Sequence, residues 1–81
     1  MKLECPCCHS LTLENQGADE ICPVCFWRDD GQDDPHADEI WGGPNYELSL
    51  TAARANYKQF GACCERVRRF VRPPEPSELA K

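Results

Sequence analysis

"ECPCCHS" (residues 4–10) and "EICPVCFW" (residues 20–27) each contain a Cys-Pro-x-Cys unit, and together they decide how this chain folds. Each unit puts two sulfur atoms on one edge of a tetrahedron, so two units brought together can surround one metal ion. The proline fixes the backbone of a tight turn, and the amides that follow can point at the first sulfur. The spacing therefore predicts one zinc ion held by Cys5, Cys8, Cys22 and Cys25.

Two other interpretations of these four cysteines stay open. Tetrahedral thiolate sites also suit iron, and two such pairs could instead be redox-active thiols or disulfides. Four sulfur ligands leave a zinc ion no open position for water or substrate. We therefore expect a structural metal whose binding energy is folding energy, and not metal-assisted hydrolysis.

The size of the chain explains why a metal would be needed. Its 81 residues make one domain, with too small an apolar core to be stable by a wide margin. The sequence has no apolar run that approaches the roughly 18 residues of a membrane span, and nothing that resembles a signal peptide. In a reducing compartment, closely spaced cysteines indicate metal ligands or reactive thiols before disulfides. We expect a cytoplasmic protein without membrane contact.

Charge is divided unevenly along the chain. The formal net charge is −5, with 2 basic and 11 acidic residues in 1–48 but 7 basic and 3 acidic residues in 49–81. The total disfavours nucleic acid as a partner. Four arginines around Phe70 keep nucleic-acid binding open as an alternative, since cations beside an aromatic ring can bind phosphates and stack a base; they are Arg66, Arg68, Arg69 and Arg72.

The organisation follows from local patterns. Residues 1–72 should form one zinc-binding domain, made of a zinc ribbon (1–27), an acidic loop (28–48) and a helical part (49–71), before a Pro-rich flexible tail (73–81). "LTLENQGADEI" predicts a hairpin around Gly17. A helix is expected over 49–61, capped by Ser49 and ended by Gly61, and a second short helix over 62–71. The fold class is small α+β: a zinc-ribbon-like hairpin with two Cys-Pro-x-Cys knuckles, packed against one or two C-terminal helices.

Side chains outside the four-cysteine set have weaker predictions. Cys7 lies inside the first unit and is expected to be a buried spectator, with a reactive thiol as the alternative. Cys63 is expected in the core and Cys64 at the surface. His9 is expected to be partly exposed, with replacement of Cys8 as a ligand or a hydrogen bond to a sulfur as the alternatives. His36 is expected in a solvated acidic loop whose spacing does not fit a calcium loop. The alternative for His36 is a second site for a hard cation, formed with Asp33, Asp34, Asp38 and Glu39. Three aromatic residues, Trp27, Trp41 and Tyr46, are expected to cover the metal site.

The order of several motifs resembles the bacterial CPCC family of small cysteine-rich proteins. The resemblance rests on CPCC (residues 5–8), ICPVCFW (21–27), GGPN (42–45) and FGA (60–62), and it covers 5–74. It implies a compact zinc-ribbon-like module with Cys5, Cys8, Cys22 and Cys25 as ligands, and no catalytic residues. The chain differs from that pattern at Arg28, where an acidic residue is common, and at His9, where a glycine is common. A positive φ would strain the histidine.

The expected function follows mainly by elimination. We expect a protein-interaction or accessory module with an unidentified protein partner, using the acidic loop and the arginine segment as contact surfaces. The alternatives are a thiol-based redox sensor or enzyme that uses Cys7, with Cys64 as resolving thiol, and nucleic-acid binding through the arginine segment.

Overall fold

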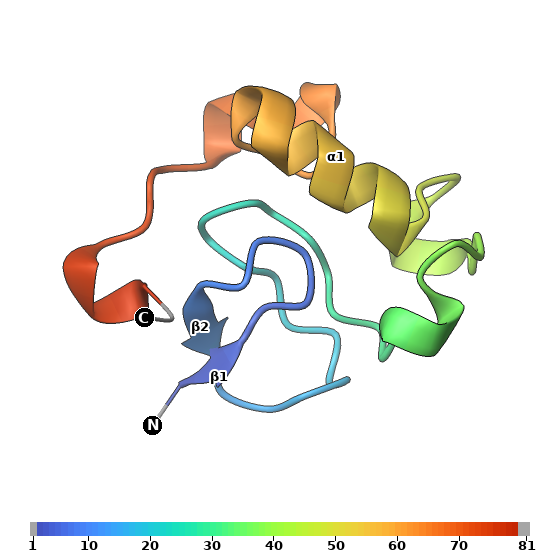
Figure 1. The fold of residues 1–81 in the computed structure, drawn as a ribbon, viewed down its shortest axis with the longest axis horizontal. Coiled ribbons are helices and arrows are strands. Elements are labelled where there is room, and N and C mark those ends of the chain that lie inside the picture. Colours follow the sequence, from blue (N-terminus) through green and yellow to red (C-terminus); the bar gives the residue numbers. More distant parts are fainter. Residues whose placement is uncertain (1, 80–81) are drawn as a thin grey trace.

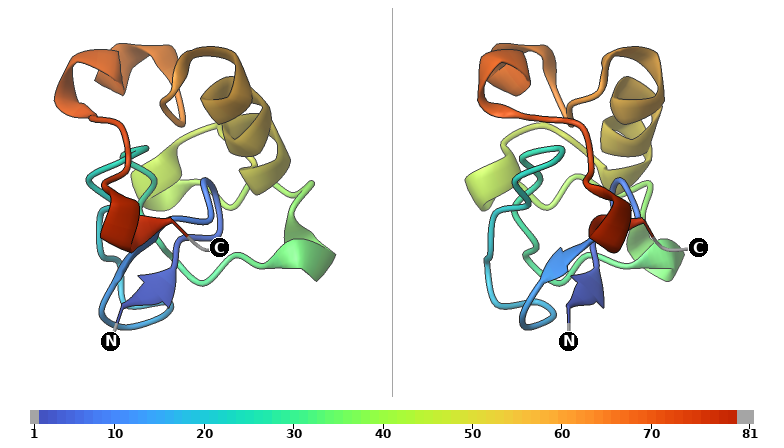
Figure 2. Two further views of the ribbon diagram at one scale, coloured as in Figure 1. Left: turned by 60° about the vertical axis from the view of Figure 1, so that its left-hand side comes forward. Right: turned by 90° about the vertical axis from the view of Figure 1, so that its left-hand side faces the viewer.

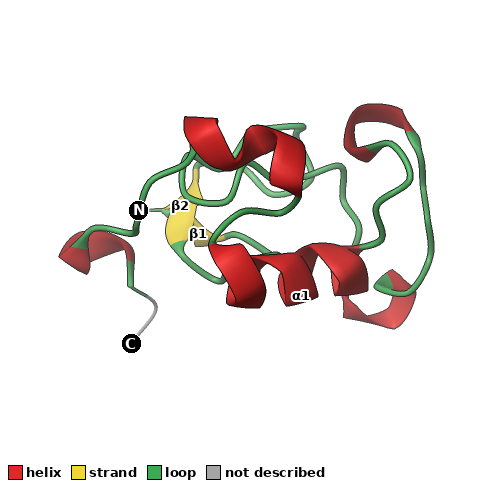
Figure 3. Cartoon of the chain, turned by 90° about the horizontal axis from the view of Figure 1, so that it is seen from above, coloured by secondary structure: helices red, strands yellow, loops and turns green. Residues whose placement is uncertain are grey.

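The computed structural model describes residues 2–79, which form an α+β fold of one short hairpin, one α-helix and several 3-10 turns. The N-terminal part is built of loops around a short hairpin, and helix α1 lies across it (Figure 1). Most of the chain is loop, with helices confined to short stretches (Figure 3). Among the described residues, no helix is both long and apolar enough to cross a membrane.

The hairpin forms around the first cysteine pair. Strand β1 (Leu3–Glu4) pairs antiparallel with β2 (Leu11–Leu13), with Leu3 opposite Leu13 and an irregularity after it. The prediction that the two strands would lie on either side of Gly17 is wrong, although the LTL segment is one of the strands. Residues 14–19 instead turn toward the second cysteine pair, which is enclosed by an isolated bridge between Ile21 and Arg28. The residues that flank each cysteine pair are therefore joined by their own antiparallel backbone pairing.

Helix α1 (Leu50–Phe60) has the ends that the sequence predicted. The Ser49 hydroxyl accepts a hydrogen bond from the Ala52 amide at 3.0 Å, which satisfies one free donor of the first turn. Gly61 ends the helix at φ 82°, a left-handed conformation that glycine adopts without strain. The helix buries Leu50 and Ala53 in the same core as the buried cysteines, and the predicted helix is confirmed with the bounds Leu50–Phe60.

The second helical segment is a 3-10 helix, η3 (Glu65–Phe70), which contacts α1. It is shorter than the predicted second helix over 62–71. Within this segment only Val67 is buried, and Phe70 is 57% exposed. Cys63 is buried as expected, but Cys64 is 9% exposed, so the prediction of an accessible Cys64 is wrong.

Buried polar side chains shape the acidic loop. Gln32 is 2% exposed and donates from Nε2 to the carbonyls of His36 and Glu39, at 2.7 and 2.6 Å. Asn45 likewise donates to the Arg28 carbonyl at 2.8 Å. Such bonds replace the regular pairing that this backbone lacks. Two short 3-10 helices interrupt the loop, η1 (Asp34–His36) and η2 (Gly43–Asn45).

Residues 73–79 run back along the hairpin. They include a 3-10 turn, η4 (Pro76–Glu78), which contacts β2. The Glu78 carboxylate accepts hydrogen bonds from both terminal guanidinium nitrogens of Arg72, at 2.8 and 2.7 Å. The sequence predicted flexibility over 73–81, and that remains a prediction; residues 80–81 lie outside the described residues.

The core lies between the cysteine loops, β2 and α1. Its largest fully buried side chains are Trp27, Leu13 and Leu50. The prediction that three aromatic residues cover the cysteine site is right for Trp27 only. Trp41 is 44% exposed and Tyr46 is 61% exposed, because the loop that carries them is held by polar side chains and needs no aromatic anchor.

Candidate metal centre

The two Cys-Pro-x-Cys units adopt the same backbone conformation. In each, the amide of the first cysteine donates to the carbonyl five residues later, and the amide four residues later donates back to that cysteine's carbonyl. The first unit has Cys5 N to Ser10 O at 2.8 Å and His9 N to Cys5 O at 2.8 Å; the second has Cys22 N to Trp27 O at 3.0 Å and Phe26 N to Cys22 O at 2.8 Å. Both pairs of sulfurs are thus held by the same tight loop.

Each loop ends in a residue with positive φ. His9 has φ 66° and Phe26 has φ 70°, a region that residues other than glycine enter at a cost of about 1–2 kcal/mol. The positive φ at His9 gives this histidine the strain that a glycine would avoid. The His9 ring contacts the Glu4 carboxylate, with His9 Nδ1 and Glu4 Oε1 3.2 Å apart. Phe26 instead stacks on Phe70, with ring centroids 5.5 Å apart.

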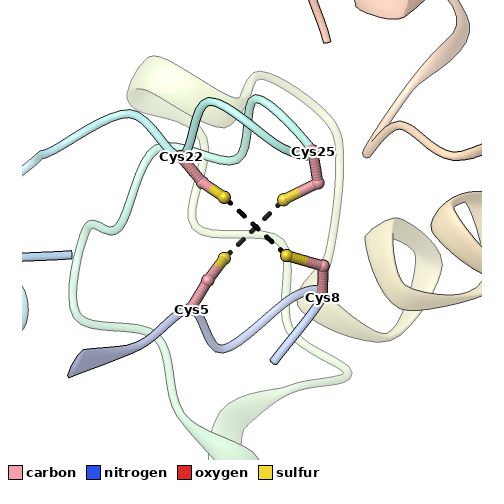
Figure 4. A group of neighbouring side chains, drawn as sticks. All are labelled: Cys5, Cys8, Cys22 and Cys25. Carbon is pink, nitrogen blue, oxygen red and sulfur yellow. Dashed lines mark hydrogen bonds between the residues drawn. The ribbon is translucent and has the colours of Figure 1, made fainter. Parts of the chain in front are cut away.

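The four sulfur atoms converge on one point (Figure 4). All of them lie within 4.8 Å of one another, with Cys5 Sγ 3.6 Å from Cys25 Sγ and Cys8 Sγ 3.7 Å from Cys22 Sγ. A tetrahedron of sulfurs around a zinc ion has edges of about 3.8 Å, because each zinc–sulfur bond is about 2.3 Å long. A disulfide would need about 2.05 Å, and all seven cysteines are free thiols. The donor set and its spacing therefore fit a tetrahedral metal ion.

The group is closed to solvent on most sides. Cys5, Cys22 and Cys25 are fully buried, and Cys8 is half-buried. Within the described residues, no second group of three or more histidine, cysteine or carboxylate ligands converges in this way. An ion held here would have four sulfur ligands and little access for water.

Two further donors reach one of the sulfurs. The Thr12 hydroxyl donates to Cys22 Sγ at 3.1 Å, and the Val24 amide approaches the same sulfur at 3.4 Å. Thr12 is 9% exposed and comes from the middle of β2. The sequence analysis did not identify it, and the only available signal was a polar residue between two leucines in a strand. Both donors would stabilise a thiolate on Cys22.

The thiols shift one another's pKa values in opposite directions. Hydrogen bonds from Cys25, then from Cys5 and Cys8, lower the pKa of Cys22, and Thr12 adds to the effect. Pairing with Cys22 raises the pKa of both Cys25 and Cys5. Negative charge is therefore favoured on Cys22, which also accepts from Thr12 and Val24. Burial of four close thiolates without a cation would be very costly, so this arrangement favours a positive ion at its centre.

The helical part is attached to both cysteine loops by single hydrogen bonds. The Arg54 guanidinium, on α1, donates from Nε to the Pro6 carbonyl at 2.8 Å. The Cys63 amide donates to the Cys25 carbonyl at 2.8 Å. Since Pro6 and Cys25 belong to different loops, the positions of α1 and the segment after it depend on the geometry of both.

The remaining cysteines lie outside the four-sulfur group. Cys7 is 2% exposed, as expected for a buried spectator, and Cys63 is 3% exposed. Burial raises the pKa of Cys63, and the neighbouring thiols of Cys64 and Cys7 add to the shift. These thiols are packed as small apolar side chains.

The two histidines are paired with carboxylates at the surface. His9 contacts Glu4, and His36 Nδ1 lies 3.1 Å from Glu39 Oε2. The hydrogen bond with Glu39 raises the pKa of His36. His36 is exposed, as predicted for a residue of a solvated loop.

The four arginines of the C-terminal segment are used in two ways. Arg68 pairs with Glu65 at 3.2 Å and Arg72 pairs with Glu78 at 2.7 Å. Arg66 and Arg69 lie over aromatic rings, 4.2 Å from the Tyr46 centroid and 5.4 Å from the Phe70 centroid, and among the described residues neither has a carboxylate partner. Arg68 also lies over a ring, 5.1 Å from the Phe60 centroid. Only half of the segment's charge is therefore balanced by neighbouring carboxylates.

Comparison with known proteins gives one match. A family model described as cysteine-rich CPCC matches residues 3–78, nearly the whole chain. No curated protein and no solved structure matches.

Proposed function

The chain belongs to the cysteine-rich CPCC family, and we propose that Cys5, Cys8, Cys22 and Cys25 hold one structural zinc ion in a zinc-ribbon-like fold. The observation that carries the proposal is the sulfur spacing, 3.6 and 3.7 Å across opposite pairs, close to the tetrahedral edge. The two loops with matching hydrogen bonds act as the knuckles of the ribbon. Iron is the alternative occupant, because it accepts the same ligands.

The ion's contribution is to folding. When bound, it neutralises the four thiolates and holds two loops that share no strand. The binding free energy of such sites in zinc-finger peptides is about 10–16 kcal/mol. A domain of this size has only about 5 kcal/mol of net stability, so the metal-free chain is unfolded. Because Arg54 and Cys63 are bonded to opposite loops, α1 and the segment behind it lose their positions as well.

The function that this architecture supports is binding of another protein in the cytoplasm, as an interaction or accessory module. Four sulfur ligands leave no site for substrate at the metal. The chain exposes large apolar side chains on the surface of a very small domain, among them Ile21, Tyr46 and Phe70. Exposed apolar groups on a small protein are typical of an interface.

The two other candidate functions have less support. A redox role for Cys7 requires access to a side chain that is 2% exposed. Nucleic-acid binding through the arginine segment requires free positive charges, and two of the four arginines, Arg68 and Arg72, are already paired with glutamates.

Metal analysis coupled to unfolding tests the proposal. The chain is purified under reducing conditions without added metal, and its native mass is measured before and after treatment with a chelator. We expect one zinc per chain, and loss of the folded circular dichroism spectrum when the zinc is removed. A chain that stays folded without metal, or that contains iron in place of zinc, would contradict the proposed structural zinc.

A further inference from the structure

A small groove lies between the second cysteine loop and η3. It has a volume of about 180 Å³, and its apolar lining comes from separate segments: Ile21, Phe26, Leu48, Cys64 and Val67. Its floor is formed by η3, since Val67 is 8% exposed and Cys64 is 9% exposed. A cavity of this size can accept one apolar side chain.

The rim of the groove is apolar and unusually open. Ile21 is 47% exposed, Tyr46 is 61% exposed, and Phe70, stacked on Phe26, is 57% exposed. These residues come from three parts of the sequence, and the fold brings them together around η3. A cluster of exposed apolar side chains on so small a domain indicates a surface that another molecule covers.

Cations surround this apolar rim. Arg28 and Arg66 line the groove, and Arg69 lies over Phe70. Within residues 2–79, neither Arg66 nor Arg69 has a carboxylate oxygen within 4.0 Å. Their guanidinium groups therefore have donors free for a partner. Within the acidic loop, η1 lies on the opposite side from η2 and η3 (Figure 2, right). Glu47 of the same loop lines a neighbouring hollow with Arg66, but among residues 2–79 the two form no ion pair.

We propose that this groove binds an acidic segment of a partner protein, with one apolar side chain of the segment in the groove and its flanking carboxylates on Arg66 and Arg69. The inference rests on the proposed function, because it names the class of partner that the interaction module recognises. Apolar burial provides the anchor, and the free guanidinium groups provide selection for negative charge and bidentate hydrogen bonds.

The same surface fits nucleic acid less well. One face of the Tyr46 ring is covered by Arg66, and one face of the Phe26 ring is covered by Phe70, so two of the rings on which a base would stack are partly occupied. A polyphosphate backbone also needs several cations in a row, whereas only Arg66 and Arg69 of the four C-terminal arginines are unpaired. Two carboxylates beside one apolar side chain match the two free arginines.

The test is an NMR titration of the zinc-loaded full chain, labelled with nitrogen-15. The probe is a synthetic pentapeptide with one central leucine flanked on both sides by aspartate and glutamate. Its control has lysines in place of the acidic residues. We expect the acidic peptide to shift the amide signals of Ile21, Phe26 and Val67 in a saturable way, and the lysine peptide to shift none of them. Equal shifts with both peptides, or shifts elsewhere only, would overturn the proposal.

Matched variants separate the roles of the arginines. The double change Arg66→Gln and Arg69→Gln should weaken binding about tenfold, because two exposed charge pairs are lost. Arg68→Gln, on the same 3-10 helix but paired with Glu65, should change the affinity less than twofold. Ile21→Ser should abolish saturable binding without unfolding the domain, since Ile21 is half exposed. Equal effects of the Arg68 and Arg66/Arg69 changes would contradict the proposed contact.

Two measurements on the same samples distinguish the causes of failure. If a single-stranded oligouridylate shifts the groove signals and the acidic peptide does not, the surface binds nucleic acid and the proposal is wrong. If neither probe binds while the native mass shows one zinc and the spectrum is that of a folded chain, the groove proposal fails and the zinc assignment stands. Loss of zinc or of the folded spectrum in the wild-type chain would instead overturn the proposed function.

Discussion

Replacing Thr12 with valine tests whether residues around the four cysteines determine metal affinity. The substitution keeps the shape of the side chain and removes the hydroxyl that donates to Cys22 Sγ at 3.1 Å. Cys22 then keeps the weaker approach of the Val24 amide, at 3.4 Å. The backbone of β2 and the four sulfur ligands are unchanged, so any loss of affinity comes from the missing hydrogen bond.

The size of the effect follows from the chemistry of that bond. A buried hydrogen bond to a charged group contributes about 1.5–3 kcal/mol. At about 1.4 kcal/mol for each tenfold change in an equilibrium constant, Thr12→Val should weaken metal binding by roughly 10-fold to 100-fold. The same range, about 10–100-fold, is found when partners of metal ligands are removed in other proteins.

The assay is competition for zinc between the protein and a chromophoric chelator at fixed pH. Thr51→Val is the matched control, because Thr51 also donates a hydroxyl hydrogen bond, at 2.6 Å, but at an exposed position and to the Asp38 carboxylate rather than to a sulfur. The control should bind zinc as the wild type does. If Thr12→Val and Thr51→Val both lie within twofold of the wild type, the hydroxyl does not stabilise a metal-bound thiolate and the reasoning is refuted.

Three other predictions concern the supporting structure. His9→Gly should stabilise the zinc-loaded domain by about 0.5–1 kcal/mol in urea unfolding, because relief of the positive φ exceeds the entropy cost of glycine; a loss of stability would contradict this. Asp29→Ala should destabilise it by about 2–3 kcal/mol, because the buried Asp29 carboxylate accepts the Gly17 amide at 2.7 Å; an unchanged urea midpoint would exclude that role. Arg72 holds the pKa of Glu78 down to about 2, so the pair stabilises the fold fully above pH 4.5, and this contribution is lost progressively as the pH falls from about 4.5 to about 2. A carboxyl NMR titration should show this low pKa and its return toward 4.5 in Arg72→Gln, and a pKa already near 4.5 in the wild type would refute the pairing.

The sequence predicted the cysteine group because its signal is local. Two Cys-Pro-x-Cys units give the sulfur pairs, and the structure brings Cys5, Cys8, Cys22 and Cys25 together; that they bind a metal stays a prediction. The ends of α1 were predictable for a similar reason, since the Ser49 cap and the Gly61 terminator act on adjacent backbone groups.

Features that depend on tertiary contacts were missed. The hairpin was misplaced because β1 is only two residues long and carries almost no pattern. Trp41 and Tyr46 were assigned to the core on their hydrophobicity, whereas the acidic loop is held by the buried polar groups of Gln32 and Asn45. Composition alone does not indicate which polar side chains will satisfy an irregular backbone.

The groove beside η3 was also invisible in the sequence. Its lining joins Ile21, Leu48 and Val67, which are far apart along the chain. The arginine segment was recognised, but its division into paired and unpaired cations depends on where Glu65 and Glu78 lie in space. Of the four arginines in this segment, the structure leaves two, Arg66 and Arg69, without a carboxylate partner among the described residues.

The burial of the spare thiols determines which measurement tests the ligand assignment. Alkylation cannot separate ligands from bystanders, because Cys7 and Cys63 are almost as buried as Cys5, Cys22 and Cys25, and more buried than Cys8. Scalar coupling through the metal can do so. In protein loaded with cadmium-113 in place of zinc, proton–cadmium correlation spectra detect only the β-protons of cysteines bonded to the ion.

We predict one cadmium signal, correlated with the β-protons of Cys5, Cys8, Cys22 and Cys25 and with no others. A correlation from Cys7, or the absence of one from any of these four cysteines, would contradict the assignment of the metal centre.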